Sequence, residues 1–194
     1  MNYLAHAYLS FNKPEILVGN LVSDFVKGRK KFDYSPGIQK GIVLHREIDH
    51  FTDTHQATRD AKEIFRPHYR LYAGALTDVL YDHFLAIDKN EFTTESLLHF
   101  SENTYRLVDP FIDGLPEKFQ KMFPYMRQQN WLNNYQYPWG IGRSLAGVVS
   151  RSAYMTESET AFRLFEENYQ HLQACYSRFF PAVKNFVLQQ LATL

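Results

Sequence analysis

The feature that most constrains the fold is the helical spacing of apolar residues, which recurs along the chain while no segment alternates as a β-strand would. It is clearest near the C-terminus, where apolar residues follow one another at alternating steps of three and four: Phe162, Phe165, Tyr169, Leu172, Tyr176 and Phe179. That spacing places them on one face of a helix, which Pro181 is expected to break or kink. Residues 1–194 are therefore predicted to form a single all-α domain, a bundle of roughly seven to nine helices.

Local start and stop signals divide the chain into predicted helices. Ser35 followed by Pro36 is typical of a helix start, because serine caps the first turn and proline fits its first position. Thr156 and Glu159 have the spacing of a capping box. No element is predicted for residues 128–142, which are rich in Asn, Gln, Gly and aromatic residues. The other predicted helices cover residues 14–25, 36–53, 54–65, 72–87 and 94–108, with a short one around 119–123.

Composition argues against several classes of protein. Lys plus Arg and Asp plus Glu both number 21, so a generally basic surface that binds nucleic acid is not expected. Cys175 is the single cysteine, which rules out an intramolecular disulfide and a cysteine-based zinc cluster and favours a reducing cytoplasm. No apolar run is long enough to span a bilayer, and the first residues lack the pattern of a signal peptide. A cytoplasmic protein that binds neither nucleic acid nor membrane is therefore expected.

Two short stretches carry carboxylates and imidazoles at helical spacing. In the first, His45 and Asp49 are one helical turn apart, so they point the same way from a helix. In the second, Asp78 and Asp82 repeat that spacing, and His83 follows directly. Two helices with inward carboxylates and imidazoles can hold a metal ion between them, and mixed oxygen and nitrogen ligation suits Mn²⁺ or Mg²⁺. Such an ion polarises phosphoryl oxygens.

The same residues also fit a structural explanation, in which they form surface ion pairs and helix caps. For one Asp–His pair this explanation is the stronger one. Two such helices in one short chain bring the two explanations level. The residues by themselves therefore leave a metal-assisted hydrolase and a purely structural role both open.

Several sequence blocks occur in a characteristic order over essentially the whole chain. They are residues 1–6, Gly19-Asn20-Leu21, Asp24-Phe25-Val26, His45-Arg46, Ile48-Asp49, Thr52-Asp53, Asp78-Val79 and Asp82-His83-Phe84-Leu85, with a looser match at Trp131-Leu132 and at Leu145, Gly147, Ser150 and Arg151. In this order and spacing, the blocks resemble the bacterial acyl carrier protein phosphodiesterase family.

The resemblance implies an all-helical, HD-domain-like fold, because this family is regarded as a divergent branch of the HD-type metal-dependent phosphohydrolases. It implies hydrolysis of the phosphodiester between 4′-phosphopantetheine and a serine of holo acyl carrier protein, with Mn²⁺ or Mg²⁺ as cofactor. The wider superfamily has an adjacent His-Asp doublet, whereas the pairs here run Asp49-His50 and Asp82-His83. Only positions that match the closer family are carried over: Asp24, His45, Asp49, Asp78, Asp82 and His83.

Roles for the acidic residues and imidazoles are predicted on chemical grounds. His45, Asp49 and Asp78 are the first candidates for metal ligands, and Asp24 is the next, as a ligand or a catalytic carboxylate. Asp82 is expected to complete the ligand shell or to orient a ligating imidazole. His83 is a candidate ligand, or the acid that protonates the departing serine oxygen.

Basic residues are candidates for contacts with the substrate. Arg46 and Arg151 can hold phosphate oxygens, because a guanidinium offers a bidentate fork; a plain surface position fits Arg151 equally well. His6 either lines the site or is a buried structural histidine. Lys27, Arg29, Lys30 and Lys31 directly follow Asp24. This basic loop is either a docking patch for the acidic carrier protein or simply a solvated loop.

Two rival functions stay open at the level of sequence. The first is an HD-type phosphohydrolase of nucleotides or other small phosphate esters on the same scaffold. The second is a helical protein that binds the carrier protein without cleaving it. The aromatic helix predicted within residues 156–180 is expected to be core, although its apolar face is also compatible with a homodimer interface.

Overall fold

The computed structural model describes residues 1–193, and every regular element among them is helical, without a strand. The all-α prediction is therefore confirmed. Short 3₁₀ helices link the longer α-helices. In chain order the elements are α1 (Tyr3–Tyr8), α2 (Pro14–Val22), η1 (Ser23–Phe25), η2 (Gly28–Asp33), α3 (Pro36–Thr54), α4 (Gln56–Tyr69), η3 (Arg70–Tyr72), α5 (Ala73–Ile87), α6 (Thr94–Val108), η4 (Asp109–Gly114), α7 (Glu117–Gln128), α8 (Trp131–Asn134), α9 (Pro138–Arg151), α10 (Glu159–Glu167) and α11 (Tyr169–Thr193).

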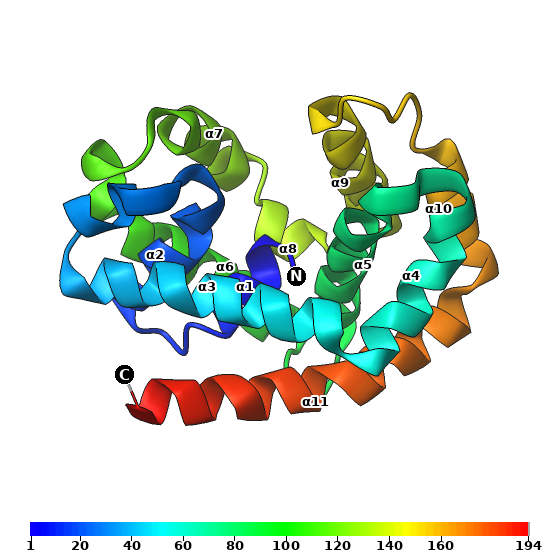
Figure 1. Ribbon diagram of the computed structural model, residues 1–194, viewed down its shortest axis with the longest axis horizontal. Helices are drawn as coiled ribbons and strands as arrows, with labels where there is room; N and C mark the ends of the chain where they lie inside the picture. The colour runs from blue at the N-terminus through cyan, green and yellow to red at the C-terminus, as the bar shows by residue number, and fades with distance from the viewer. Residues whose placement is uncertain (194) are drawn as a thin grey trace.

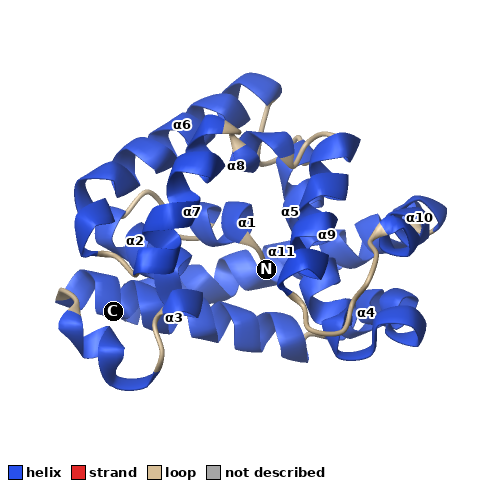
Figure 2. Ribbon diagram, turned by 90° about the horizontal axis from the view of Figure 1, so that it is seen from above, coloured by secondary structure: helices blue, strands red, loops and turns tan. Residues whose placement is uncertain are grey.

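The helices form two groups with α1 between them (Figure 1). Helices α2, α3, α6 and α7 make one group, and α4, α5, α9 and α10 make the other. Helix α11 runs beneath both groups and packs on α3, α4, α5 and α10. Seen from above in Figure 2, the N-terminus again lies between the two groups. Residues at the start of the chain therefore contact helices from both halves of the molecule.

Helix starts follow the predicted capping chemistry in the first half of the chain. The Ser35 side chain accepts a hydrogen bond from the backbone N–H of Ile38 at the start of α3, with Pro36 in the first turn. Thr93 and Ser96 cap α6 reciprocally, as a capping box does. These local hydrogen bonds explain why the starts of α3 and α6 could be predicted closely.

The second half departs from prediction at several points. The capping box at Thr156–Glu159 is wrong, because Ser158 precedes α10 and the backbone N–H of Thr160 is bonded to the carboxylate of Glu157. Pro181 lies inside α11 without ending it. The basic segment expected to be a loop forms the 3₁₀ helix η2, and residues 128–142 form α8 and the start of α9.

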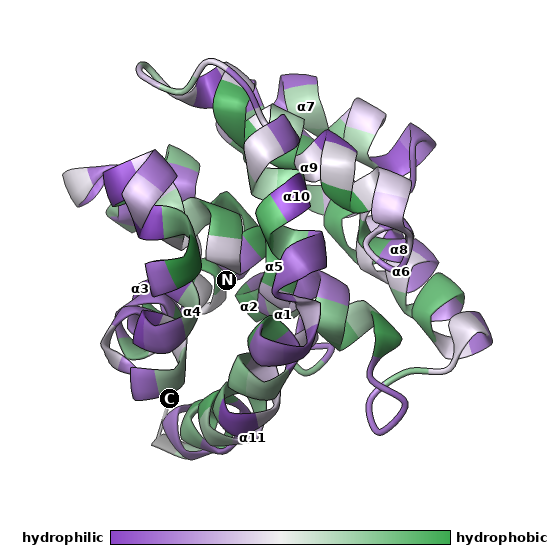
Figure 3. Cartoon of the chain, turned by 90° about the vertical axis from the view of Figure 1, so that its right-hand side faces the viewer, coloured by the Kyte–Doolittle hydropathy of each residue, from purple (hydrophilic) through white to green (hydrophobic). Residues whose placement is uncertain are grey.

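Buried apolar side chains from most of the helices form the core. The aromatic face that was predicted to lie on one helix is divided between α10 and α11, so the prediction of one continuous helix is wrong. Its members Phe165, Leu172, Tyr176 and Phe179 are buried, as expected of core residues, whereas Phe162 and Tyr169 are half-buried. In Figure 3, hydrophobic and hydrophilic residues alternate around the helices, as amphipathic packing requires. None of the helices formed by residues 1–193 is both long and apolar enough to cross a membrane.

Helices α2 and α3 approach each other unusually closely through two glycines. A Cβ atom built on Gly19 would lie 2.1 Å from the carbonyl oxygen of Ile38, and one built on Gly41 would lie 2.3 Å from that of Ile16. Neither position can carry a side chain without moving the helices apart. The contact brings Asn20, which follows Gly19 on α2, into hydrogen-bonding distance of His45, one helical turn after Gly41 on α3.

Candidate metal centre

Three side chains from two helices converge where α1 crosses α3. His6 comes from α1, and His45 and Asp49 come from one face of α3, as their spacing predicted. The His6 Nε2 atom lies 3.2 Å from one carboxylate oxygen of Asp49, and the His45 Nε2 atom lies 3.1 Å from the other. The two imidazole rings are stacked, with centroids 4.0 Å apart. Both imidazoles are buried, whereas the Asp49 side chain is 41% exposed, so the cluster opens to solvent on its carboxylate side.

Asn20 fixes the orientation of both imidazoles. Its amide nitrogen donates to the carbonyl oxygen of His6 and to the hydroxyl of Ser10, so its amide oxygen is left to accept from His6 Nδ1 at 2.8 Å. Its backbone carbonyl accepts from His45 Nδ1 at 2.7 Å. With protons on both Nδ1 atoms, each Nε2 atom carries a lone pair directed at Asp49.

This geometry places electron-pair donors against one another, which requires a positive charge between them. Both Nε2 atoms are buried without a hydrogen-bond donor, and the three groups supply ligand atoms within 4.8 Å of one another. A proton on an Nε2 atom or a bound cation removes the repulsion. Two imidazoles held by second hydrogen bonds, together with one carboxylate, form a donor set that fits a divalent transition metal such as Mn²⁺.

The pKa values of His6, His45 and Asp49 show how the cluster is charged when a proton, and not a metal ion, supplies the positive charge. Burial by itself would lower the pKa of His45, but hydrogen bonds to Asp24 and Asp49 outweigh it and raise the pKa to about 9. Burial and the neighbouring charge of His45 lower the pKa of His6 to about 4. Burial opposes ionisation of Asp49, yet hydrogen bonds from both imidazoles keep the pKa of its carboxyl well below the usual range. Asp49 is therefore an anion at neutral pH.

Two further carboxylates border the cluster. Asp24, in η1, places an oxygen 3.3 Å from His45 Nε2 while 76% of its side chain is exposed. The hydrogen bond from His45 lowers the pKa of the Asp24 carboxyl, so it too is ionised. Asp78, on α5, lies 2.9 Å from the amino nitrogen of Met1, which is 3.7 Å from Asp49. The predicted set of Asp24, His45, Asp49 and Asp78 is thus gathered in one region.

Comparison with known proteins shows what this chain is similar to. A model of the family described as acyl carrier protein phosphodiesterase matches residues 1–183. The acyl carrier protein phosphodiesterase of Photorhabdus laumondii is 33% identical over 182 residues, which cover 93% of this chain and 92% of that protein. That of Yersinia enterocolitica is 34% identical over 184 residues, covering 94% and 95%. This chain belongs to the acyl carrier protein phosphodiesterase family.

The resemblance noted in the sequence is thus confirmed at the level of this family. No solved structure is a significant match to the chain. The further relation to HD-type phosphohydrolases stays a prediction.

Asp82 and His83 lie apart from the cluster in this member of the phosphodiesterase family. The Asp82 carboxylate accepts hydrogen bonds from the backbone N–H groups of Asn2, Leu4 and Ala5, at 3.2, 2.7 and 3.2 Å, and so caps α1. Burial raises its pKa to about 7, although these three donors oppose the shift. The structure therefore does not bring Asp82 to the metal centre as predicted.

His83 faces the opposite side of α5, towards α8 and α11. Its Nδ1 atom donates to the carbonyl oxygen of Tyr135 at 2.7 Å, and its Nε2 atom lies 3.4 Å from the Tyr169 hydroxyl. Its ring also packs edge-on against Phe165. These contacts give His83 a structural position in the core, and they do not support the predicted role as ligand or acid.

The predicted basic residues are divided between two surfaces. Arg46 is one position beyond His45 on α3, points away from the cluster and donates to the carbonyl oxygen of Val26 at 3.0 Å. Lys27, Arg29 and Lys30 are exposed around η2, directly after Asp24. Lys31 is half-buried beside them and lies over the exposed ring of Phe32. Arg151 is separate from these residues, at the C-terminal end of α9.

Sequence reasoning did not recognise Asn20 as part of the site. The available signal is that Asn20 is the one polar residue in the run Ile16–Val22, whose residues are all buried. A fully buried amide must be hydrogen-bonded, so its position among aliphatic residues indicates polar partners nearby. Those partners are His6 and His45, which the sequence places on two other helices.

Proposed function

We propose that this protein is a metal-dependent hydrolase that cleaves the phosphodiester between 4′-phosphopantetheine and the serine of holo acyl carrier protein. The observation that carries the proposal is the convergence of His6 Nε2, His45 Nε2 and the Asp49 carboxylate around one point. Membership of the acyl carrier protein phosphodiesterase family supports the choice of substrate, because the match to relatives of that name covers nearly their full length.

The proposed metal ligands are His6, His45 and Asp49, with Asp24 next to them. We favour Mn²⁺ over Mg²⁺, because two imidazole nitrogens suit Mn²⁺ better than an ion that prefers oxygen. When bound, either ion supplies Lewis-acid polarisation of the phosphoryl group. Asn20 holds both imidazoles in the ligating orientation, so no tautomer change is needed when the ion enters.

Asp24 is the proposed acid–base group. It is ionised, it touches the cluster through His45, and most of its side chain faces solvent. A carboxylate in that position can accept a proton from the attacking water and deliver it to the serine oxygen that leaves. His83 is not assigned this role, because its two ring nitrogens are engaged with Tyr135 and Tyr169.

The carrier protein is proposed to dock on the basic segment around η2. Lys27, Arg29, Lys30 and Lys31 follow Asp24 within a few residues, so an acidic partner bound there reaches the metal centre. Replacing Lys30 and Lys31 by Glu should raise the KM for holo carrier protein by about tenfold at low salt. Hydrolysis of bis(p-nitrophenyl) phosphate should be unchanged, and an equal loss on both substrates would contradict the docking role.

Mass spectrometry of holo acyl carrier protein tests the proposed function directly. The carrier protein is incubated with this protein plus Mn²⁺, Mg²⁺ or a chelator. We expect loss of the phosphopantetheine mass with a divalent metal and none with the chelator. Absence of release under every metal, together with hydrolysis of nucleotides or other small phosphate esters, would favour the rival phosphohydrolase instead.

A further inference from the structure

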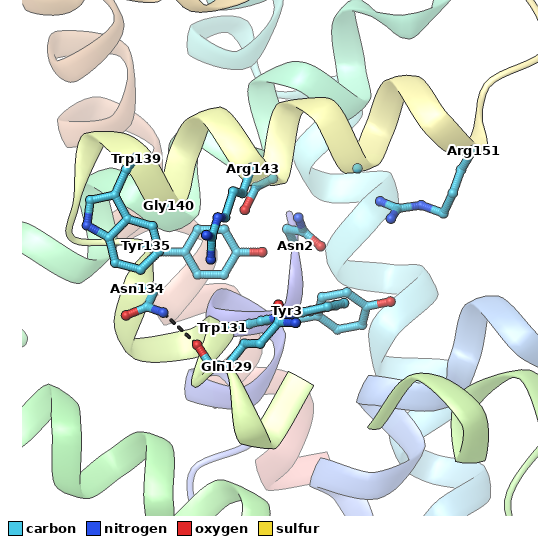
Figure 4. Close-up of a pocket in the computed structure, with 12 residues that line it drawn as sticks. Asn2, Tyr3, Gln129, Trp131, Asn134, Tyr135, Trp139, Gly140, Arg143 and Arg151 are labelled. Carbon is cyan, nitrogen blue, oxygen red and sulfur yellow. Dashed lines mark hydrogen bonds between the residues drawn. The ribbon is translucent and has the colours of Figure 1, made fainter. Parts of the chain in front are cut away.

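A cavity of about 260 Å³ lies beside the metal centre, between α1, α8 and α9 (Figure 4). Asn2 and Tyr3 form its wall on the side of α1, and His6 follows them on the same helix. Met1, the residue before Asn2, contacts Asp49 and Asp78 through its amino nitrogen. The cavity and the cluster are thus separated by a single short segment of backbone.

The lining of the cavity combines amides, aromatic rings and cations. The amides are those of Asn2, Gln129 and Asn134, and the indole rings are those of Trp131 and Trp139. Trp131 donates to the Gln129 side chain, and the Asn134 side chain donates to the Gln129 backbone, so this wall is held in place by its own hydrogen bonds. No carboxylate is among the described residues that line the cavity.

Two arginines enter the cavity from α9, and neither forms a salt bridge within the described part of the chain. Arg143 lies over the Trp139 ring, 5.1 Å from its centroid. Arg151 points into the cavity from the C-terminal end of α9, on the side where the Tyr3 hydroxyl lies (Figure 4). The Tyr3 hydroxyl is within electrostatic reach of both Arg151 and Asp24, so this end of the cavity is the one next to the metal centre.

The two ends of the cavity differ. Its Arg151 end adjoins the cluster that would act on a phosphodiester, and its other end is formed by the Trp139 ring with Arg143 over it. Between Trp139 and Arg151, α9 advances by about 18 Å. An extended phosphopantetheine chain spans a comparable length and has a phosphate at one end, two amide groups and a dimethyl group in the middle, and a thiol at the other end.

We propose that this cavity binds the pantetheine arm of the substrate, with the phosphate at Arg151 and the thiol end at Trp139, an assignment that rests on the proposed function. The side chains of Asn2 and Gln129 match the two amides of the arm, which can both donate and accept hydrogen bonds. Trp131 and Trp139 match its apolar carbons. A bound arm would hold the phosphodiester at the metal centre while the carrier protein stays outside.

Gly147 offers a way to fill the cavity without disturbing the backbone. A Cβ atom at Gly147 meets nothing closer than the guanidinium tip of Arg151, at 3.3 Å, and that tip can move. Gly147→Leu therefore places a side chain in the cavity. Ala146→Leu is the matched control, because Ala146 is the adjacent residue on the same helix, is exposed and does not line the cavity. Trp139→Ala removes the far wall and provides an independent second variant.

The experiment measures binding of pantetheine and 4′-phosphopantetheine by calorimetry, in the presence of a chelator, to folded wild-type protein and each variant. We expect Gly147→Leu and Trp139→Ala to weaken pantetheine binding by about tenfold or more, and Ala146→Leu to leave it unchanged. In steady-state assays Gly147→Leu should raise the KM for holo carrier protein, whereas Ala146→Leu should leave this KM unchanged.

The outcomes separate this assignment from the proposed function. Pantetheine binding that Gly147→Leu abolishes, in a protein that releases nothing from holo carrier protein, would support the cavity and refute the reaction. Release by wild type that Gly147→Leu and Trp139→Ala leave unaffected would refute the cavity and support the reaction. Failure of wild-type protein to bind pantetheine, or tighter binding of AMP than of pantetheine in the same cavity, would overturn the assignment.

Discussion

Helices α3 and α5 carry the same kinds of residue and use them in different ways. His45 and Asp49 on α3 direct their free nitrogen and oxygen atoms at each other and at His6. Asp82 and His83 on α5 direct theirs at backbone groups of α1 and of the segment that contains Tyr135. His45 and His83 are both buried, so burial of the imidazole does not distinguish the two pairs. What distinguishes them is whether the facing segment supplies a complementary backbone group.

The comparison shows how a site differs from a structural pair of the same composition. On α5, three N–H donors satisfy Asp82, and a carbonyl satisfies one nitrogen of His83. On α3, the facing helix α1 supplies a second imidazole instead, so neither Nε2 atom meets a hydrogen-bond donor of the protein. The polar groups of α5 hold the fold together, whereas those of α3 require a cation or a proton. The predictions below test that division.

The largest effect is expected at Asp49. Asp49→Ala removes the carboxylate that both imidazoles face, and it should lower phosphopantetheine release by about a thousandfold, equivalent to roughly 4 kcal/mol of transition-state stabilisation. Asp53→Ala is the matched control, one turn along the same helix, where the carboxylate is exposed and pairs with Lys62. Mass spectrometry of the carrier protein measures both. Full activity in Asp49→Ala would remove the α3 cluster from the mechanism.

A smaller effect, on stability instead of metal binding, is expected at Asp82. Asp82→Ala leaves three backbone N–H groups at the start of α1 without an acceptor, which should cost about 3 kcal/mol of unfolding free energy. Urea denaturation measures this loss. The Mn²⁺ affinity of the folded variant should equal that of wild type. A folded, stable Asp82→Ala that no longer binds Mn²⁺ would restore the original ligand prediction.

Substitutions of His6 and of His83 should have different effects on the Mn²⁺ affinity of the protein. His6→Ala is expected to weaken Mn²⁺ binding by about 10- to 100-fold, because it removes one of the two aligned Nε2 atoms. His83→Asn should not change it, since Asn retains a donor for the carbonyl oxygen of Tyr135. Titration of Mn²⁺ followed by electron paramagnetic resonance gives both constants. Equal weakening in the two variants would mean that the helices do not divide the roles as described.

The smallest effect is a pH dependence of stability due to His83. Burial lowers the pKa of folded His83 below the usual 6.5, and its hydrogen bond to Tyr135 only partly opposes this. Between the two pKa values, His83 is protonated in the unfolded chain and neutral in the folded one. The free energy of unfolding is therefore highest, as far as His83 is concerned, above pH 6.5, and it declines as the pH falls towards the folded pKa. His83→Asn should flatten the decline in urea midpoints below pH 6.5. An unchanged pH profile would show that other groups cause it.

Local rules predicted the helices well where caps and periodicity act within one turn. Ser35 and Pro36 mark the start of α3 as predicted, and the bounds of α5 differ from prediction by one residue at its start. Pro181, which was predicted to break or kink its helix, does not end α11, because buried residues such as Phe179 and Val183 anchor the helix on both sides of it. Packing outweighed the lost backbone hydrogen bond there.

The candidate site was predictable in its residue types and not in its partners. One-turn spacing on α3 correctly placed His45 and Asp49 on a common face, because that relation is internal to the helix. How α1 and α2 cross α3 and α5 determines that His6 and Asn20 belong to the cluster and that Asp82 bonds to the backbone of α1 instead. No pattern within a single helix contains that information.

The glycine contact between α2 and α3 has a consequence for engineering a more thermostable enzyme. Replacing mid-helix glycines by alanine is a standard stabilising substitution, worth up to about 1 kcal/mol where the added methyl group is tolerated. Gly19 and Gly41 are mid-helical, and the methyl group would collide with backbone atoms of the opposite helix at both. Replacing either glycine by alanine would therefore move Asn20 away from His45, so a variant chosen for heat resistance would lose the alignment of its two imidazoles.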